Sequence, residues 1–273
     1  MSTLSAGRTR GNNGPSAHVR ARDQPQPRCV GASTGTWCDN HQVARRPATS
    51  LATSVPPIRT LLERYLAAQL AGDRRAALRI VVDEGLGGGV PVPTLYLDVV
   101  QAAQYRIGEL WQGNRITVAQ EHLATAISQV ALAELYRVLP CQPPHGRRAL
   151  VACVGGELHE LGTRITADFF EMAGFDVRYL GASVPTDSLV AMVREDPPAL
   201  LVLSVTMSFH LDTLHEAVQR TRAAVGDRLR LALGGQAFTW APALVGQLGA
   251  EVYGRDARES VALARQLLGL EPR

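Results

Sequence analysis

Gly155-Gly156-Glu157-Leu158-His159-Glu160-Leu161-Gly162 is the stretch that decides how the second half of the chain folds. The apolar run 148–154 stops at the two glycines, and helical spacing of apolar residues begins at Leu161. The stretch is therefore predicted to turn from a buried strand into a helix. This turn places His159 at the carboxyl edge of a sheet, where open α/β sheets bind ligands close to the point at which the strand order reverses.

Strands and helices are predicted to alternate on both sides of this turn. The regular alternation favours an α/β fold with a parallel five-stranded sheet, flavodoxin-like or Rossmann-like, with helices on both faces. The predicted strands are 148–154, 175–180, 199–204, 229–233 and a short 251–253, and the predicted helices lie near 161–173, 186–195, 211–224, 239–248 and 256–268.

Residues 56–140 have a purely helical pattern. A first helix begins at Ile58, a second follows the N-cap Asp73, a third ends near Gly113, and a fourth opens on the capping box that starts at Thr117. Four amphipathic helices joined by short loops predict a four-helix bundle that would act as a cap on the sheet. The residues of the fourth helix predicted to face inward are Leu123, Ile127, Ala131, Leu135 and Val138.

The chain divides at the proline-rich segment 141–146. The cap is predicted to span residues 56–140, and an α/β domain is predicted to span 146–273. Residues 1–55 hold seven arginines against two acidic residues and no apolar segment, so they are predicted to be a disordered tail.

Composition excludes several classes of protein. All 28 basic residues are arginine, which excludes pyridoxal-phosphate enzymes, Schiff-base aldolases and Walker-type phosphate loops, because each needs a lysine. The longest apolar runs are too short for a membrane span, and no secretory signal is visible. Four scattered cysteines favour a reducing cytoplasm. A metal site at Cys29, Cys38 and His41 would match no zinc spacing.

Small and polar residues follow the other strands at the edge that carries His159. Ser204 and Thr206 end the third predicted strand, and Gly234 and Gly235 end the fourth. Missing side chains let a ligand approach the backbone closely. The residues describe a slot lined by glycine and hydroxyl groups, with an imidazole at its mouth, although a single histidine in such a loop is more often only exposed to solvent or hydrogen-bonded locally.

The stretch 157–162 resembles the Asp-x-His-x-x-Gly motif of cobalamin-binding domains, with Glu157 in place of the aspartate. The resemblance implies that His159 binds cobalt in place of the cofactor's own nucleotide base, and that Glu157 holds the far imidazole nitrogen. It also implies that the nucleotide tail enters the sheet beside the serine and glycine positions. The implied cofactor-binding residues of the sheet domain are Glu157, Leu158, Glu160, Gly162, Ser204, Thr206, Gly234 and Gly235.

Trp111, nine intervening residues, and then Glu121 and His122 resemble the W-x9-E-H pattern of the CarH-like photoreceptor branch. The resemblance implies that these side chains cover the upper face of adenosylcobalamin. Without the other motif, Trp111 would be interpreted as core and Glu121 as a favourable charge at a helix start. The chain departs from the branch at Gln112, where many members carry histidine, and residues 1–55 lack a helix-turn-helix pattern, so direct DNA binding is not expected.

The leading hypothesis is a cobalamin-based light sensor that is not an enzyme. It would signal to an unknown downstream protein through movement of the cap or altered self-association, with a homodimer as one open form. A branch of this hypothesis adds a linear tetrapyrrole such as biliverdin, as in photocobilins. The alternative is a corrinoid shuttle protein of a cobalamin-dependent methyltransferase system. Coenzyme-B-type mutases are disfavoured because no barrel domain is predicted.

Overall fold

The computed structural model describes residues 57–226 and 229–270, which belong to one structural unit. The predicted tail 1–55, and with it the Cys29, Cys38 and His41 alternative, lies outside the described residues. No helix within the described ranges is both long and apolar enough to cross a membrane.

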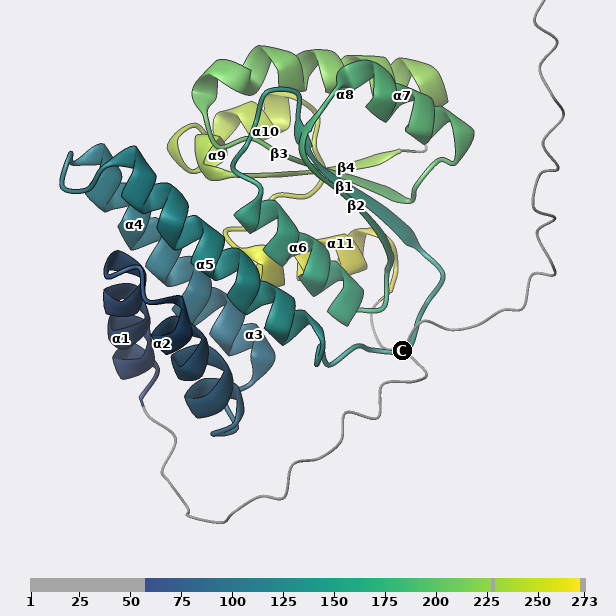
Figure 1. Cartoon of the computed structure of the whole chain (residues 1–273). Helices are drawn as coiled ribbons and strands as arrows, with labels where there is room; N and C mark the ends of the chain where they lie inside the picture. Colours follow the sequence, from purple (N-terminus) through teal and green to yellow (C-terminus); the bar gives the residue numbers. More distant parts are fainter. Residues whose placement is uncertain (1–56, 227–228, 271–273) are drawn as a thin grey trace, which may run out of the picture. The chain divides into compact units, whose positions relative to one another are not determined.

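Residues 58–136 form the helical half (Figure 1). It consists of four helical stretches, two of which contain a π-helical segment. They are α1 (Ile58–Leu70); α2 (Arg74–Leu78) continued by η1 (Arg79–Leu86); α3 (Val92–Thr94), η2 (Leu95–Gln101) and α4 (Ala102–Gln112) in succession; and α5 (Val118–Tyr136).

The predicted helix ends rest on the expected local interactions. The Asp73 carboxylate accepts a hydrogen bond from the Ala76 N–H at 2.9 Å, and Thr117 and Gln120 form the reciprocal capping box. The prediction that Leu123 and Val138 face inward is wrong, because both side chains are exposed. Val138 lies beyond the end of α5, and Leu123 lies in its first turns.

Residues 148–267 form the sheet half, in which helices separate parallel strands (Figure 1). The strand order is β2-β1-β3-β4, as predicted for a flavodoxin-like sheet. The strands are β1 (Arg148–Val154), β2 (Asp176–Val184), β3 (Leu200–Ser204) and β4 (Arg230–Gly234). The helices are α6 (Leu161–Met172), α7 (Thr186–Glu195), the 3₁₀ turn η3 (Ser208–His210), α8 (Leu211–Val225), α9 (Gln236–Trp240), α10 (Ala243–Gln247) and α11 (Ala257–Leu267).

The predicted fifth strand is wrong, since the sheet of the described residues has four strands. Within the segment 251–253, Val252 forms an isolated parallel bridge to Ala232, and the Glu251 N–H donates to the Leu231 carbonyl at 3.0 Å. Gly254 follows at once, and its backbone lies against α11, where an added Cβ would be 2.3 Å from the Ser260 nitrogen.

The predicted helix 239–248 is also wrong, because the chain forms two short helices there, α9 and α10. Pro242 separates them, and a proline disfavours helical geometry at the preceding residue. Ala241 accordingly leaves the helical region, with φ −136° and ψ 65°. Strand β2 runs four residues further than predicted, to Val184, with a bulged register against β1 and positive φ at Gly181 and Ser183.

Alternate residues of the strands enter two separate hydrophobic clusters, as expected for a sheet covered on both faces. Leu150 and Ala152 pack with α7 and α8, whereas Ala149 and Val151 pack with α6, α11 and the helical half. The helical half and one face of the sheet half thus share one cluster. The division into domains at 140–146 stays a prediction.

Candidate functional site

The loop between β1 and α6 is shaped by glycine. Gly156 has a φ of 85°, and a Cβ added there would lie 2.8 Å from Cε1 of His210, so a side chain is excluded by both the backbone and the neighbour. The Gly156 N–H donates to the Ser183 hydroxyl at 3.0 Å, which fastens the loop to the end of β2. The backbone is therefore tightly held just before Glu157.

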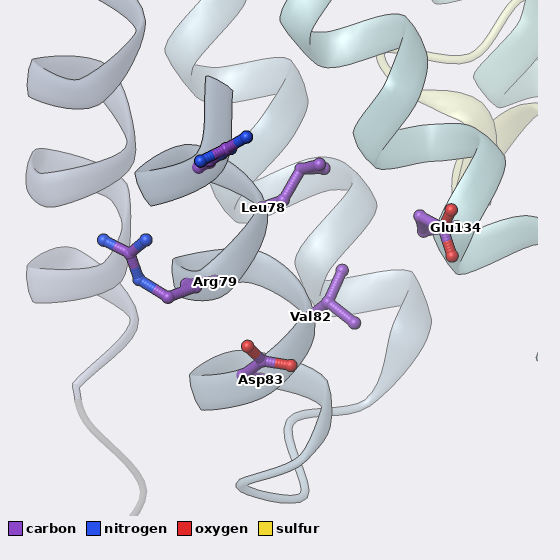
Figure 2. Close-up of a pocket in the computed structure, with 6 residues that line it drawn as sticks. Leu78, Arg79, Val82, Asp83 and Glu134 are labelled. Atoms are coloured by element: carbon purple, nitrogen blue, oxygen red, sulfur yellow. The ribbon is translucent and has the colours of Figure 1, made fainter. Parts of the chain in front are cut away.

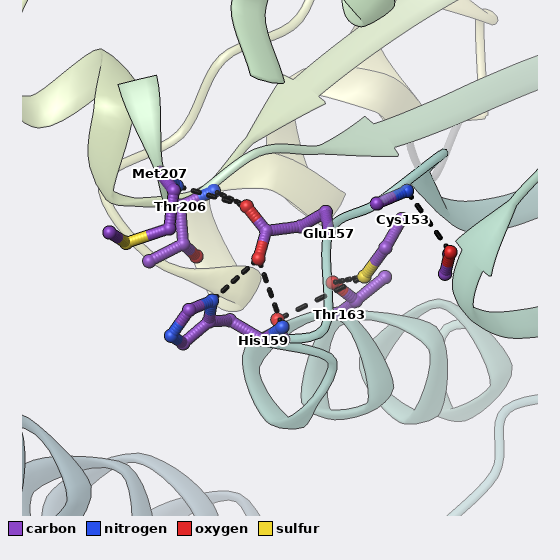
Figure 3. Close-up of polar contacts among 8 residues, drawn as sticks. Cys153, Glu157, His159, Thr163, Thr206 and Met207 are labelled. Carbon is purple, nitrogen blue, oxygen red and sulfur yellow. Dashed lines mark hydrogen bonds and ion pairs between the residues drawn. The ribbon is translucent and has the colours of Figure 1, made fainter. Parts of the chain in front are cut away.

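Glu157 is completely buried and joins two loops through its carboxylate (Figure 3). Its Oε2 accepts hydrogen bonds from the N–H groups of Thr206 (2.8 Å) and Met207 (2.9 Å) after β3. Its Oε1 accepts from the N–H and from Nδ1 of His159, at 3.0 and 2.5 Å. Each oxygen has two donors, so the carboxylate fixes the orientation of the imidazole ring against the sheet edge.

The electrostatics of this pair favour a charged carboxylate. Burial alone would raise the pKa of Glu157, but the hydrogen bonds from the His159 ring and from three backbone N–H groups lower it to about 2. Glu157 in turn raises the pKa of His159. Because a carboxylate only accepts, Nδ1 carries the hydrogen, and a neutral His159 presents its lone pair at Nε2. The side chain of His159 is 48% exposed, and Nε2 has no hydrogen-bond partner among the described residues.

The strand ends beside this loop contain the predicted small residues. Ser204 at the end of β3 is buried and lies in register with Gly234 at the end of β4. A Cβ added at Gly234 would meet nothing within 4 Å, so its backbone faces open space. Glycine is required at position 235 for a different reason: the φ of Gly235 is 103°, and a Cβ there would lie 2.1 Å from the Val205 oxygen. Thr206 contributes its backbone N–H to Glu157.

The remaining predicted residues of the loop have three different environments. Leu158 is exposed, and a Cβ added at Gly162, at the start of α6, would meet no atom within 4 Å. Glu160 is partly buried, and its carboxylate accepts from the Tyr179 hydroxyl at 3.0 Å and from the amide of Gln129 at 3.4 Å. Gln129 belongs to α5, so Glu160 links the loop to the helical half.

In the helical half, Trp111 lies at the end of α4 and is partly buried, and Glu121 and His122 lie in the first turns of α5. Glu121 is only 21% exposed, and its carboxylate contacts Nδ1 of His122 at 2.5 Å and accepts from the Thr125 hydroxyl at 2.8 Å. Its charge also contributes to the raised pKa of His159. Glu121 is therefore within electrostatic reach of the sheet edge. No hydrogen bond or ion pair in 57–226 and 229–270 joins Trp111 or His122 to the sheet half.

Several residues that build the site were missed from the sequence. Ser183 was missed because β2 was predicted to end at 180, and Tyr179 was assigned only to a strand. Gln129 carried no signal, since a glutamine in a long helix is ordinarily a solvent-facing residue. The N–H of Met207 could have been anticipated, because a loop that follows a strand leaves backbone donors unpaired.

A cavity of about 400 Å³ lies elsewhere, on the helical half (Figure 2). Its lining comes from α2, η1 and α5 and includes none of the predicted site residues. It is lined by Arg75, Leu78, Arg79, Val82, Asp83 and Glu134.

Comparison with known proteins assigns a class to this arrangement. Residues 147–262 match the family model described as "B12 binding domain", and residues 61–136 match a second model of the same description. The chain belongs to the family of B12-binding-domain proteins, and its ligand is cobalamin.

Individual relatives fall into two groups. The chain is 30% identical over 213 residues to the HTH-type transcriptional repressor CarH of Myxococcus xanthus. The aligned region covers 78% of this chain and 69% of that protein. It is 29% identical over 123 residues to the trimethylamine corrinoid protein of Methanosarcina barkeri, covering 44% of this chain and 55% of that protein. The fold resembles the structure of the Methanosarcina barkeri monomethylamine corrinoid protein, with a TM-score of 0.67, 17% identity, and coverage of 77% of this chain and all of the other.

The residues at the sheet edge fit cobalamin. The loop offers one imidazole nitrogen, which suits a metal whose other positions are filled by its own macrocycle, and a carboxylate orients that imidazole. Gly234 and Gly162 leave room beside it. Within the described ranges, no group of three or more His, Cys, Asp or Glu side chains could hold a bare metal ion.

Proposed function

We propose that the protein is a cytoplasmic cobalamin-based light sensor of the CarH-like branch, and that it is not an enzyme. In this proposal Nε2 of His159 is the cobalt ligand, Glu157 orients the ring, and the four-helix cap presents Trp111, Glu121 and His122 to the upper face. The bound adenosylcobalamin would supply a cobalt–carbon bond that visible light breaks.

The observation that carries the proposal is the position of Glu121. Its charge acts on His159, although the two residues belong to different halves and are 38 positions apart. A charge on α5 that acts on the loop of His159 supports a site shared by the two motifs, as a cofactor held from two sides would require. The 30% identity to the CarH protein of Myxococcus xanthus over both halves supports the same assignment.

Signalling would use the packing of the helical half on the sheet half. Among the described residues, three pairs of side chains join the halves by hydrogen bonds: Gln129 and Glu160, Tyr136 and Glu171, and Tyr96 and Asp168. A change at the upper face of the cofactor would alter this packing or the self-association of the chain, and a downstream protein would respond to the altered surface.

The test uses the full chain loaded with adenosylcobalamin in darkness and then exposed to green light. The expected result is a light-dependent change in the absorption spectrum together with a change in elution on size exclusion. His159→Ala should change the dark spectrum, because the lower ligand is lost. His215→Ala is the matched control, since His215 lies on α8 and bonds only Gln219. Identical spectra and elution before and after light would refute the proposal.

A bilin as second chromophore is a branch of the same proposal. It is motivated by Gln112, which stands where many members of the branch carry histidine, and which is exposed at the end of α4. Co-expression with a source of biliverdin should then produce far-red absorbance. If protein fully loaded with cobalamin showed no such absorbance, a bilin chromophore would be excluded and the cobalamin proposal would still stand.

The second candidate is a corrinoid shuttle protein that carries a methyl group between methyltransferases. It is supported by the 29% identity to the trimethylamine corrinoid protein of Methanosarcina barkeri. The measurement that separates the two is methyl transfer from the methylcobalamin-loaded chain to a thiol in the presence of a methyltransferase. Transfer without any response to light would favour the shuttle.

A further inference from the structure

A chain of polar side chains runs through the core of the helical half, where helices ordinarily pack apolar residues against one another. Its inner members Tyr65, Gln69 and Ser128 are all buried. This chain of polar side chains crosses three helices and ends at the proposed upper-face residue Glu121. In order, its members are Tyr65 and Gln69 of α1, Ser128 of α5, Gln104 of α4, and Thr125 and Glu121 of α5.

The direction of the hydrogen bonds can be worked out from the Glu121 end. A carboxylate only accepts, so the Thr125 hydroxyl donates to Glu121 Oε1, at 2.8 Å. This donation uses the only hydrogen of the hydroxyl, and the Thr125 oxygen therefore accepts from Nε2 of Gln104, at 2.7 Å. The amide of Gln104 is consequently locked with its nitrogen toward Thr125 and its oxygen toward the core.

The same direction continues inward. Gln104 Oε1 accepts from Nε2 of Gln69 at 2.9 Å and from the Ser128 hydroxyl at 3.1 Å. Ser128 has then used its hydrogen, so its oxygen accepts from the Tyr65 hydroxyl at 3.0 Å. Every hydrogen in the chain points from α1 toward Glu121, and bonds aligned in this way polarise one another.

Gln69 shows that this direction is enforced. Its Oε1 is buried without a hydrogen-bond partner, which is unfavourable. Turning the amide over would not relieve it, because the oxygen would then face two obligate acceptors, Gln104 Oε1 and the Ala124 carbonyl, and the nitrogen would take the unpaired position. The nitrogen must stay where it is, and the unpaired oxygen is the consequence.

We propose that Thr125 and Gln104 are positioning residues that hold the Glu121 carboxylate in the single orientation with which it recognises the upper ligand of cobalamin. The proposal rests on the proposed function for the identity of that ligand. One oxygen of Glu121 is held by Thr125 and the other by His122. Removing the Thr125 hydroxyl frees the carboxylate to rotate and leaves the Gln104 nitrogen without its acceptor.

The test compares two cobalamins that differ only in the upper ligand. Affinities for adenosylcobalamin and methylcobalamin are measured in darkness by absorbance titration, together with the thermal unfolding of the cobalamin-free chain. Thr125→Val keeps the shape of the side chain and removes the hydroxyl. It should weaken adenosylcobalamin binding roughly tenfold, the usual effect of losing a hydrogen bond to a charged group, and leave methylcobalamin binding within about twofold.

Thr125→Ser should restore adenosylcobalamin affinity, because it restores the donor. Gln104→Glu is a second isosteric change: its carboxylate would compete with Glu121 for the Thr125 hydrogen, and the same selective loss is expected. Thr60→Val is the control, since Thr60 is exposed on α1 and its hydroxyl bonds no other residue in the part of the chain that the structure describes. It should bind both cobalamins like the parent.

Three outcomes would overturn the proposal, each in a different way. If Thr125→Val weakened the binding of both cobalamins equally, the hydrogen-bonded polar side chains would contribute to stability alone. Unchanged affinities in a parent that prefers adenosylcobalamin would show that Glu121 needs no positioning and would leave the proposed function standing. A parent that binds both cobalamins equally would refute upper-ligand recognition by Glu121, whereas the proposed function is refuted only by the absence of a response to light.

Discussion

Glu157 and Asp168 are both buried carboxylates in the sheet half, yet their pKa values move in opposite directions. Burial raises the pKa in each case. At Glu157, hydrogen bonds from the His159 ring and three backbone N–H groups outweigh burial and bring the pKa to about 2. At Asp168, one hydrogen bond from the Tyr96 hydroxyl does not, and the pKa is about 7. The hydrogen bonds outweigh burial at Glu157, whereas at Asp168 burial outweighs the single donor and the nearby charge of Arg164.

The difference follows from where each residue lies in the fold. Glu157 is in a loop that faces another loop, and the loop residues Thr206 and Met207 have backbone N–H groups free to donate. Asp168 is inside α6, where the neighbouring backbone donors are used within the helix. A sheet edge can therefore hold a charged carboxylate beside the proposed cobalt ligand His159, whereas the contact between the two halves holds a carboxyl group whose pKa is about 7.

The largest expected effect is the pH dependence caused by Asp168. Its folded pKa lies above its usual value of 3.8, so the folded state binds the proton more tightly, and stability falls as the pH rises from about 4 to 7. Asp168→Asn keeps the shape without the charge. It should match the parent below about pH 4, and its advantage over the parent should grow by roughly 2–4 kcal/mol between pH 5 and pH 8, measured by urea unfolding of the cobalamin-free protein.

The difference in stability between Asp168→Asn and the parent is the informative quantity, because other groups titrate in the same pH range.

Glu157→Gln removes the carboxylate whose pKa is lowered. An amide nitrogen in place of Oε2 would face the N–H groups of Thr206 and Met207, and one in place of Oε1 would face the N–H of His159, so in either orientation a fixed backbone donor loses its acceptor. The free energy of unfolding at pH 7 should fall by about 2–3 kcal/mol.

Glu121→Gln is the matched control for Glu157→Gln, because its partners are side chains that can adapt. The Thr125 hydroxyl can rotate, and the ring of His122 can change tautomer. The loss should stay below about 1 kcal/mol. Equal losses for Glu157→Gln and Glu121→Gln would contradict the distinction between backbone and side-chain donors.

The fold was largely predictable, because its signals are local. Apolar runs, the glycine pair after 154 and the caps at Asp73 and Thr117 define most of the helices and strands correctly. The errors came at tertiary contacts: the segment 251–253 adds only an isolated bridge to β4 before Gly254 packs against α11, and β2 extends through Gly181 and Ser183 with a bulged register against β1.

The part of the candidate site at the sheet edge was predictable from the sequence, whereas the polar residues behind Glu121 were not. His159, Glu157 and the strand-end residues follow from one turn and one sheet edge. The polar chain behind Glu121 draws on α1, α4 and α5, and its members Gln69 and Gln104 are ordinary helix residues in the sequence. Three-dimensional packing alone brings them together, so no spacing in the sequence could have indicated them.

The smallest expected pH-dependent effect is that of Tyr96→Phe, which removes the hydroxyl donor of Asp168. With Asp168 ionised at pH 8, a hydrogen bond to a charge is lost, at about 2 kcal/mol; at pH 5 a neutral bond is lost, at about 1 kcal/mol. The pKa of Asp168 should rise further, which steepens the fall in stability with pH. Urea unfolding at both pH values measures this, with the exposed Tyr105→Phe as control at under about 0.5 kcal/mol. A loss that is the same at both pH values would mean that Asp168 keeps one protonation state throughout, and the contrast with Glu157 would then rest on something other than the balance between burial and hydrogen bonds.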